Sequence, residues 1–318
     1  MNKTPYILVL AMLLLNVSAC KLQTEKKHNA VPGVTAGELS TNLEKEQGLE
    51  MAKAESKYVK DALVVIDETR KSLTFLQDKK KKEALGALEK VIGKLELLLA
   101  IDPKIALIPV NSDATTENLI ADIRSIEAMR HEAQSLINKG YFQAARNILN
   151  GMSSEIRVRT YNLPLETYPA AIKEAVKLIT NDKFDDAKML LQRTLTTLVI
   201  VEDVIPIPVI NAQFMVARAK DIADGNTPDK LDESKKKEIF GLLAGARAEL
   251  KLAEALGYGR ENRDFGALDA HIKEIEGKIK DKIDTQQLFD ALTKHLNVFR
   301  DDIVKNAKIK SESDNINQ

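Results

Sequence analysis

Apolar residues recur every three or four positions along most of the chain, a spacing that favours amphipathic helices over strands. One stripe runs over positions 39–76 and a second over 84–99, with four consecutive lysines, Lys79 to Lys82, between them. These two helices are expected to pair as an antiparallel hairpin, because the break between them is short. Further helices are expected at about 115–138, 141–150, 165–181, 184–203, 208–224, 232–255 and 266–308, the last with a bend near 284–285.

Three helix starts resemble one another. Residues 139–142 read Lys-Gly-Tyr-Phe and residues 181–184 read Asn-Asp-Lys-Phe, each followed by an alanine and a leucine at the same distances, and a weaker copy begins at 82. A small residue one turn after the start lets two helices approach closely, so the repeat predicts stacked helical hairpins. We interpret it as a packing device rather than a peptide-binding array. The predicted fold class is mainly α, a bundle of helical hairpins with pseudo-repeats and a long C-terminal helix or helical hairpin.

Two apolar runs that contain proline interrupt the helical pattern, at 105–110 and 204–209. Between them, residues 155–161 alternate in polarity, which is the period of a half-buried strand. This segment is expected to pair with one of the runs in one small antiparallel β-ribbon, with proline confined to an edge. The alternation puts Ile156 and Val158 on one face and Arg157, Arg159 and Tyr161 on the other.

The first twenty residues have the order of a bacterial lipoprotein signal. Lys3 precedes an apolar run over 6–15, and the small residues Val17-Ser18-Ala19 stand directly before Cys20. This order predicts a signal peptide over 1–19, and Val-Ser-Ala-Cys resembles the lipobox, whose cysteine is acylated by diacylglycerol. The apolar run is too short for a transmembrane helix, which needs about 20 residues. Because Cys20 is the only cysteine in 318 residues, lipidation explains it better than an ordinary signal peptide that happens to end near a cysteine.

The predicted organisation after the signal peptide has four parts. Residues 20–36 are expected to be the lipidated cysteine and a flexible polar tether, with a reach on the order of 20 Å. A helical domain over 37–258, a C-terminal helical extension over 259–308 and a disordered tail over 309–318 follow. Lys21 stands where an aspartate would favour retention in the inner membrane of a Gram-negative cell. We therefore expect the chain on the periplasmic side of an envelope membrane, with the outer membrane favoured.

Composition narrows the classes of function. Lys+Arg and Asp+Glu both number 47, so the chain lacks the basic excess that nucleic-acid binding requires. With 44% hydrophobic residues the chain can bury a substantial core. Nucleic acid is accordingly not an expected partner.

The segment from about 39 to 258 resembles the YfdX family of exported bacterial proteins. The resemblance is carried by five short motifs in a matching order: Gln47 to Met51, Ala62-Leu63, Lys139 to Ala145, Tyr161 to Leu165 and Lys183 to Ala187. It implies a mainly helical periplasmic protein associated with stress responses such as acid exposure, and it supplies no catalytic residues. The lipobox and the segment 259–318 depart from the family pattern and argue against free diffusion.

Motifs for catalysis and cofactor binding are missing from the sequence. His131-Glu132 begins an HExxH-like string, but Ser135 occupies the position of the second zinc ligand. GxSxG, P-loop and GxGxxG motifs are also missing. We expect no enzyme activity, no metal and no cofactor.

One cluster is a candidate ligand site. Arg157, Arg159, Tyr161 and Tyr168 flank the turn Leu163-Pro164-Leu165 and would project from one side of the ribbon. Guanidinium and phenol groups could bind an anionic or aromatic ligand. The alternative is that these residues are ordinary surface of an exposed ribbon.

The C-terminal segment carries an apolar stripe with spacings of three and four. Its members are Leu268, Ile272, Ile275, Ile279 and Ile283, followed by Phe289, Leu292, Leu296, Phe299 and Ile303. The stripe is expected to pack on the rest of the chain, and its near-heptad spacing leaves open a homo-oligomer through these helices.

Two functions follow from these observations. The first is a membrane-anchored envelope lipoprotein of the YfdX type, a non-catalytic interaction or chaperone-like protein of the acid-stress response, with envelope proteins as partners. Falling pH protonates carboxylates while Lys and Arg stay charged, so self-repulsion would loosen the bundle. The alternative is a protein that binds a small anionic or aromatic molecule between its helices.

Overall fold

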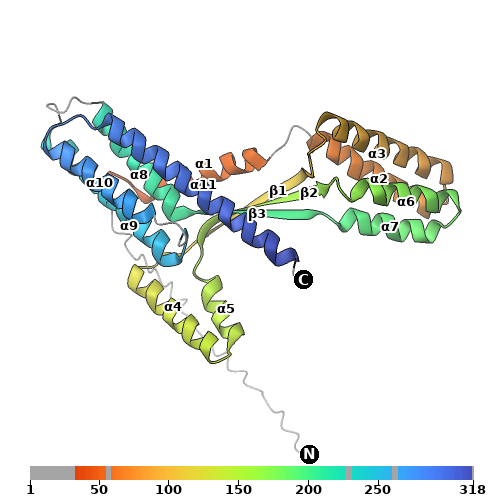
Figure 1. The fold of residues 1–318 in the computed structure, drawn as a ribbon, viewed down its shortest axis with the longest axis horizontal. Helices are drawn as coiled ribbons and strands as arrows, with labels where there is room; N and C mark the ends of the chain where they lie inside the picture. The colour runs from red at the N-terminus through yellow and green to blue at the C-terminus, as the bar shows by residue number, and fades with distance from the viewer. Residues whose placement is uncertain (1–32, 55–58, 226–230, 260–263, 317–318) are drawn as a thin grey trace, which may run out of the picture. The chain divides into compact units, whose positions relative to one another are not determined.

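A computed structural model describes residues 33–54, 59–225, 231–259 and 264–316. The chain is mainly helical, with one small antiparallel sheet (Figure 1), and this confirms the predicted fold class. The predicted signal peptide, Cys20 and most of the tether lie outside the described residues. In chain order the elements are α1 (Ala36–Ala54), α2 (Val59–Gln77), α3 (Lys81–Ile101), β1 (Leu107–Asn118), α4 (Ile123–Asn138), α5 (Phe142–Asn150), β2 (Ser154–Pro164), α6 (Tyr168–Thr180), α7 (Phe184–Thr196), β3 (Val199–Pro206), α8 (Ile207–Asp224), α9 (Glu233–Leu256), α10 (Asp264–Lys280) and α11 (Gln286–Ile316).

The sheet is larger than the predicted ribbon. The expected strand is present as β2, and it pairs antiparallel with β1 on one side and β3 on the other, rather than with one apolar run alone. The predicted helix over 115–138 was wrong at its start, because 115–118 belong to β1. The predicted helix over 184–203 was wrong at its end, because 199–203 belong to β3. These ends are rich in the β-branched residues Thr, Val and Ile, which fit a pleated sheet better than a helix. Pro109 and Pro206 lie on the two edge strands, as predicted, and the register shifts beside Pro109.

The first core joins two helical hairpins, α2–α3 and α6–α7. Successive turns of each helix contribute a small or branched side chain to this core, and Ile108 and Leu163 of the sheet join it. Its helical members include Ala84, Leu88, Val91, Ile172, Ala175, Ile179, Ala187 and Leu191. The predicted hairpin of the first two stripes is thus α2–α3. The long helix expected over 39–76 is described as α1 and α2, with 55–58 between them outside the described residues.

The turns of these hairpins share one backbone conformation. Lys79, Gly140, Asp182 and Lys282 each adopt a positive φ, of 58°, 80°, 57° and 55°. In each turn the next residue donates its N–H to the carbonyl five positions earlier, as from Tyr141 to Leu136. This closure satisfies a carbonyl that the end of the first helix leaves unpaired. The structure therefore confirms the predicted repeat and adds a fourth copy at the α10–α11 turn.

The second core is built from the last four helices. The C-terminal stripe, from Leu268 to Ile303, is buried there with Met215 and Val216 of α8 and with Leu242 and Leu243 of α9, except for the exposed Ile283. The segment after 258 therefore packs on the body and shares its core with α8 and α9, rather than forming a separate extension. Helix α11 runs to Ile316 through most of the segment expected as a disordered tail, since no Gly or Pro in that segment would end the helix.

The two faces of the sheet have different surroundings. Ile156 and Val158 are buried with Ile205, Ile207 and Ile210, and Leu43 of α1 and Val304 of α11 pack against them. The side chain of Gln47 in α1 donates to the Ala114 carbonyl of β1. Helices α1 and α11 therefore cover the apolar face. Arg157, Arg159 and Tyr161 lie on the opposite face, as the alternation predicts.

Glu249 is a largely enclosed carboxyl between α8 and α9. It accepts a hydrogen bond from Asn211 Nδ2 at 3.3 Å, and burial raises its pKa from 4.5 to about 7 in spite of that bond. Because the folded-state pKa lies above the ordinary value, the charged form of Glu249 opposes folding. The stability lost to this charge is therefore recovered as the pH falls from about 7 to 4.5.

Replacing Glu249 with Gln should stabilise the protein at pH 8 and leave its stability unchanged at pH 4.5. A pKa shift of this size corresponds to about 3 kcal/mol at most in the free energy of unfolding. Such a change moves the midpoint temperature of unfolding by several degrees. Thermal unfolding followed by circular dichroism at the two pH values measures the difference. Glu254→Gln, at an exposed position of the same helix, is the matched control. Equal effects of Glu249→Gln at both pH values would contradict the assignment.

Candidate functional site

The charged face of the sheet is centred on β2. In the two pairing registers, Arg157 lies opposite Thr115 and Val204, and Arg159 lies opposite Asp113 and Glu202. Cross-strand partners share a face, so acids of β1 and β3 flank the two arginines of the central strand. We call the group Asp113, Glu117, Glu155, Arg157, Arg159, Tyr161, Glu202 and Tyr258 the charged cluster.

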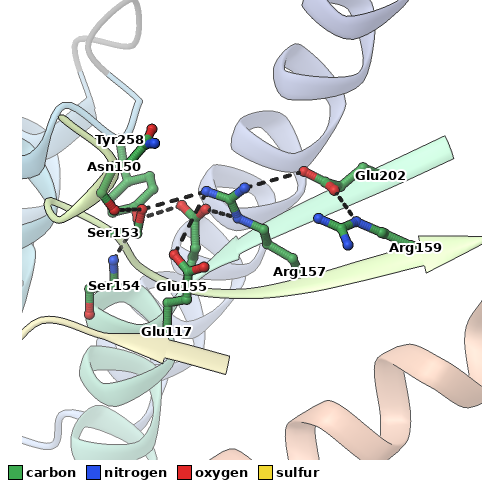
Figure 2. Close-up of polar contacts among 9 residues, drawn as sticks. All are labelled: Glu117, Asn150, Ser153, Ser154, Glu155, Arg157, Arg159, Glu202 and Tyr258. Atoms are coloured by element: carbon green, nitrogen blue, oxygen red, sulfur yellow. Dashed lines mark hydrogen bonds and ion pairs between the residues drawn. The ribbon is translucent and has the colours of Figure 1, made fainter. Parts of the chain in front are cut away.

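Arg157 is the centre of this cluster. Figure 2 shows its guanidinium group between Glu202 on one side and Glu155 with Glu117 on the other. Its Nε donates to Glu155, and its terminal nitrogens lie 3.7 Å from Glu202 and 3.9 Å from Glu117. Partial burial alone would lower the pKa of Arg157, but the three carboxylates outweigh it and raise this pKa above its ordinary value. The guanidinium is therefore held in its charged form.

Arg159 and Tyr161 extend the cluster along β2. Arg159 Nε donates to Glu202 Oε2 at 2.7 Å, and this hydrogen bond raises the pKa of Arg159. The Tyr161 hydroxyl donates to Asp113 Oδ2 at 2.8 Å, which raises the pKa of Tyr161. All three predicted residues of β2 thus share one face, and each contacts an acid of the same sheet.

Glu155 connects the sheet to the C-terminal half of the chain. Its side chain is almost completely buried, and it accepts hydrogen bonds from Arg157 and from the Tyr258 hydroxyl, the latter at 2.6 Å. The same hydroxyl accepts from the Ser154 N–H at 3.0 Å. Burial is the main cause that raises the pKa of Tyr258, so the hydroxyl keeps its proton and donates it to Glu155.

The end of α9 places Tyr258. Gly257 adopts φ +92°, and its N–H bonds to the Glu254 carbonyl while the Tyr258 N–H bonds to the Ala253 carbonyl. This is the pattern of a Schellman motif, which a residue without a Cβ forms most readily. Residues 257–259 are therefore a helix terminus followed by a turn.

Tyr168 does not belong to the charged cluster. It is 1% exposed on α6, in the core of the two hairpins, and its hydroxyl donates to Thr69 Oγ1 of α2 at 3.2 Å. Burial raises its pKa. Its predicted place beside Arg157 is wrong, because the residues after Pro164 turn away into α6 and the apolar body of the ring is used for packing.

The acids outnumber the arginines in the cluster. Asp113, Glu117, Glu155 and Glu202 surround two guanidinium groups, so the face carries a negative balance when all groups are ionised. An anionic ligand would have to displace these carboxylates. Ligand binding by Arg157, Arg159 and Tyr161 stays a prediction.

The described residues show neither a metal site nor a membrane-spanning helix. In the part of the chain that the structure describes, no three His, Cys, Asp or Glu side chains converge as a metal site would require. Each helix of the described segments is too short or too polar to cross a membrane.

Sequence reasoning missed Glu155, Glu202 and Tyr258. Glu155 stands two residues before Arg157 in the predicted strand, so the alternation could have placed it on the charged face. Glu202 falls at the end of the helix expected over 184–203, and only its place in β3 reveals its pairing with Arg159. Tyr258 lies about a hundred residues along the chain from Glu155, and no local pattern connects them.

Comparisons with known proteins identify a relationship in the first two thirds of the chain. The model of a family described as "YfdX protein" matches residues 65–204, from α2 to β3, a shorter segment than the expected 37–258. Among solved structures, one of Salmonella Typhi YfdX aligns with 46% of this chain and 91% of its own, at 14% sequence identity and a TM-score of 0.31. Curated protein sequences give no match.

Replacing Tyr258 with Phe should destabilise the protein by about 1–3 kcal/mol. The change removes a donor from the buried Glu155 carboxylate and an acceptor from the Ser154 N–H, and leaving such groups unpaired costs about that much. Urea unfolding gives the free energy, and Tyr141→Phe, at an exposed tyrosine, is the control. An unchanged free energy of unfolding in Tyr258→Phe would exclude a structural role for this contact.

Proposed function

We propose that the chain is an envelope lipoprotein of the YfdX type, on the premise that the YfdX family model matches its residues 65–204. We propose that it acts without catalysis, as an acid-responsive interaction protein. The sequence Val17-Ser18-Ala19-Cys20 supports the anchor, because small residues precede the single cysteine of the chain. Acylation of Cys20 would keep the folded part on the periplasmic side of its membrane, with the outer membrane favoured.

The charged cluster is the observation that carries the proposed acid response. Its positive charges come from Arg157 and Arg159, which keep their protons at any pH a cell survives. Its negative charges come from the carboxylates of the cluster, and carboxylates as a class lose their charge in strong acid while guanidinium groups keep theirs. Acidification would therefore convert this face from a negative to a positive balance, leaving two guanidinium groups free to pair with carboxylates or phosphates of a partner. Such a surface would bind other envelope proteins when the periplasm becomes acidic.

Replacing Glu117 and Glu202 with Gln should move the cluster towards its acid state at neutral pH, because two acids instead of four then face the two arginines. The double variant removes two carboxylates beside Arg157 while keeping their size. We expect it to suppress aggregation of a model client at pH 7 as well as the wild type does at about pH 3, below the ordinary carboxyl range, in a light-scattering assay. Glu174→Gln with Glu233→Gln, two acids that each pair with a lysine one turn away, is the control. A wild type that protects clients equally at both pH values, or at neither, would exclude this acid response.

A second candidate is supported by a cavity on the opposite face of the sheet. It has a volume of about 510 Å³ and lies between α1, the three strands and α11. Arg300 supplies a largely enclosed guanidinium there, already paired with Glu46 at 3.1 Å, and Thr160 and Asn162 of β2 line the floor. A small anionic or aromatic molecule could occupy it. Calorimetry against a panel of such ligands tests this binding. The double variant Arg157→Glu/Arg159→Glu leaves this cavity intact, so it distinguishes binding here from binding at the charged cluster.

The anchor itself is tested by Cys20→Ser. The variant should lose label from radioactive palmitate and move to the soluble envelope fraction, because it lacks the thiol that carries the lipid. Lys21→Asp should keep the label and move the protein towards the inner membrane. If the wild type takes up no label, or fractionates like Cys20→Ser, the proposed placement is wrong.

A further inference from the structure

Hairpin α4–α5 exposes large apolar side chains around its turn. Tyr141 and Phe142 are 62% and 64% exposed, and Ile137 and Leu149 are exposed on the helices that meet there. Ala133 and Ala145 are buried where the two helices contact each other. Contiguous exposed apolar surface of this kind marks an interaction site.

The sister hairpin α6–α7 shows that these positions are contact positions. The two hairpins match with an offset of 42 residues, so Ile137, Phe142 and Leu149 correspond to Ile179, Phe184 and Leu191. In α6–α7 these three pack into the core with α2 and α3, and Ile179 and Leu191 are completely buried. Hairpin α4–α5 therefore has the same apolar pattern as its sister, although these positions are exposed in the described part of the chain.

The tip of α4–α5 differs from its sister in charge. Asp182, Asp185 and Asp186 of the sister turn correspond to Gly140, Gln143 and Ala144. The stretch 133–150 contains no Asp or Glu, although 47 of the 318 residues are acidic, about one in seven. It contains two exposed cations, Lys139 and Arg146.

This combination identifies the partner class. An apolar face built only for helix packing would be expected to keep the acids of its sister turn, since the α6–α7 tip uses Asp182 to pair with Lys81 of α3 at 2.6 Å. Aromatic residues beside basic ones, without acids, are instead typical of segments at the surface of an anionic bilayer. Aromatic rings bury their apolar body at the headgroup level, while cations approach lipid phosphates.

We propose that the tip of hairpin α4–α5, residues 137–149, docks into the headgroup region of an anionic lipid bilayer. The site is separate from the charged cluster and does not depend on acylation of Cys20. With the lipid anchor it would give the chain a second contact to the same membrane. Two weak membrane contacts in one chain bind far more tightly than either alone.

A tryptophan reporter tests insertion directly, because the chain contains no tryptophan. Residues 20–318 with Cys20→Ser, which cannot be acylated, are prepared with Tyr141→Trp. On vesicles of phosphatidylglycerol and phosphatidylethanolamine, the emission should shift to the blue and be quenched by brominated acyl chains. Met189→Trp, at a position 61% exposed on α7, is the control and should show neither effect. Equal behaviour of the two reporters would overturn the proposal.

Vesicle flotation measures the contribution of the side chains. Tyr141→Ser with Phe142→Ser should lower the partition coefficient on anionic vesicles at least tenfold, whereas Leu97→Ser with Ile101→Ser, at exposed positions of α3, should leave it unchanged. Lys139→Gln with Arg146→Gln should lower binding to anionic vesicles and remove its salt dependence. The flotation chains all carry Cys20→Ser, and if this unacylated chain with an unchanged tip does not float with anionic vesicles, the proposal is overturned. If Tyr141→Ser with Phe142→Ser instead converts an oligomer into a monomer in sedimentation velocity without vesicles, the tip is an interface between copies.

Palmitate labelling of Cys20 is unaffected by these variants, so failure here is distinguishable from failure of the proposed anchor.

Discussion

Strand β2 must satisfy two opposite requirements at once, and the arrangement around it follows from them. Its Ile156 and Val158 need an apolar cover, which α1 and α11 supply. Its Glu155 is a buried carboxylate, and burying such a charge without donors would cost several kcal/mol. Arg157 on the same strand and Tyr258 after α9 provide those donors. One buried charge therefore holds the central strand and the end of α9 in a single arrangement.

The repeated hairpins show how one local pattern serves two purposes. Both α4–α5 and α6–α7 use a turn with a positive φ and a buried alanine one turn later. In α6–α7 the remaining apolar residues complete a core with α2 and α3, so they stabilise the fold. In α4–α5 the same positions are exposed. Exposed apolar groups contribute nothing to the stability of the isolated chain, and their presence is explained by a partner surface.

Acid changes the stability that different carboxyl groups of this chain contribute in opposite directions. Burial raises the pKa of Glu249, so mild acid removes an unfavourable charge between α8 and α9. Hydrogen bonds from Lys71 and Lys273 lower the pKa values of Glu68 and Asp269, whose stabilising contributions disappear only when the pH falls below the ordinary carboxyl range. A moderately acidic medium therefore strengthens the α8–α9 contact before it weakens the ion pairs.

Local pattern determined much of the architecture. Amphipathic periodicity predicted the helices, the two-residue alternation around Arg157 predicted β2 and its faces, and the repeated turn sequences predicted the hairpins. Each of these depends on neighbours within a few residues, where spacing alone decides which side chains share a face. The lipobox-like string before Cys20 is likewise a short linear pattern, and the lipidation that it predicts stays a prediction.

Contacts between distant segments decided the rest. The edge strands were missed where helix-like spacing continued into them, because strand pairing with β2 outweighs local propensity. Tyr168 was placed beside the arginines by sequence proximity, whereas the turn after Pro164 carries it into a core with Thr69. The pairing of Tyr258 with Glu155, and the exposure of Phe142 where Phe184 is covered, depend on which elements pack together. Sequence alone determined which faces are apolar or charged; only the tertiary structure decided which of those faces meet, because that depends on the packing of the whole chain.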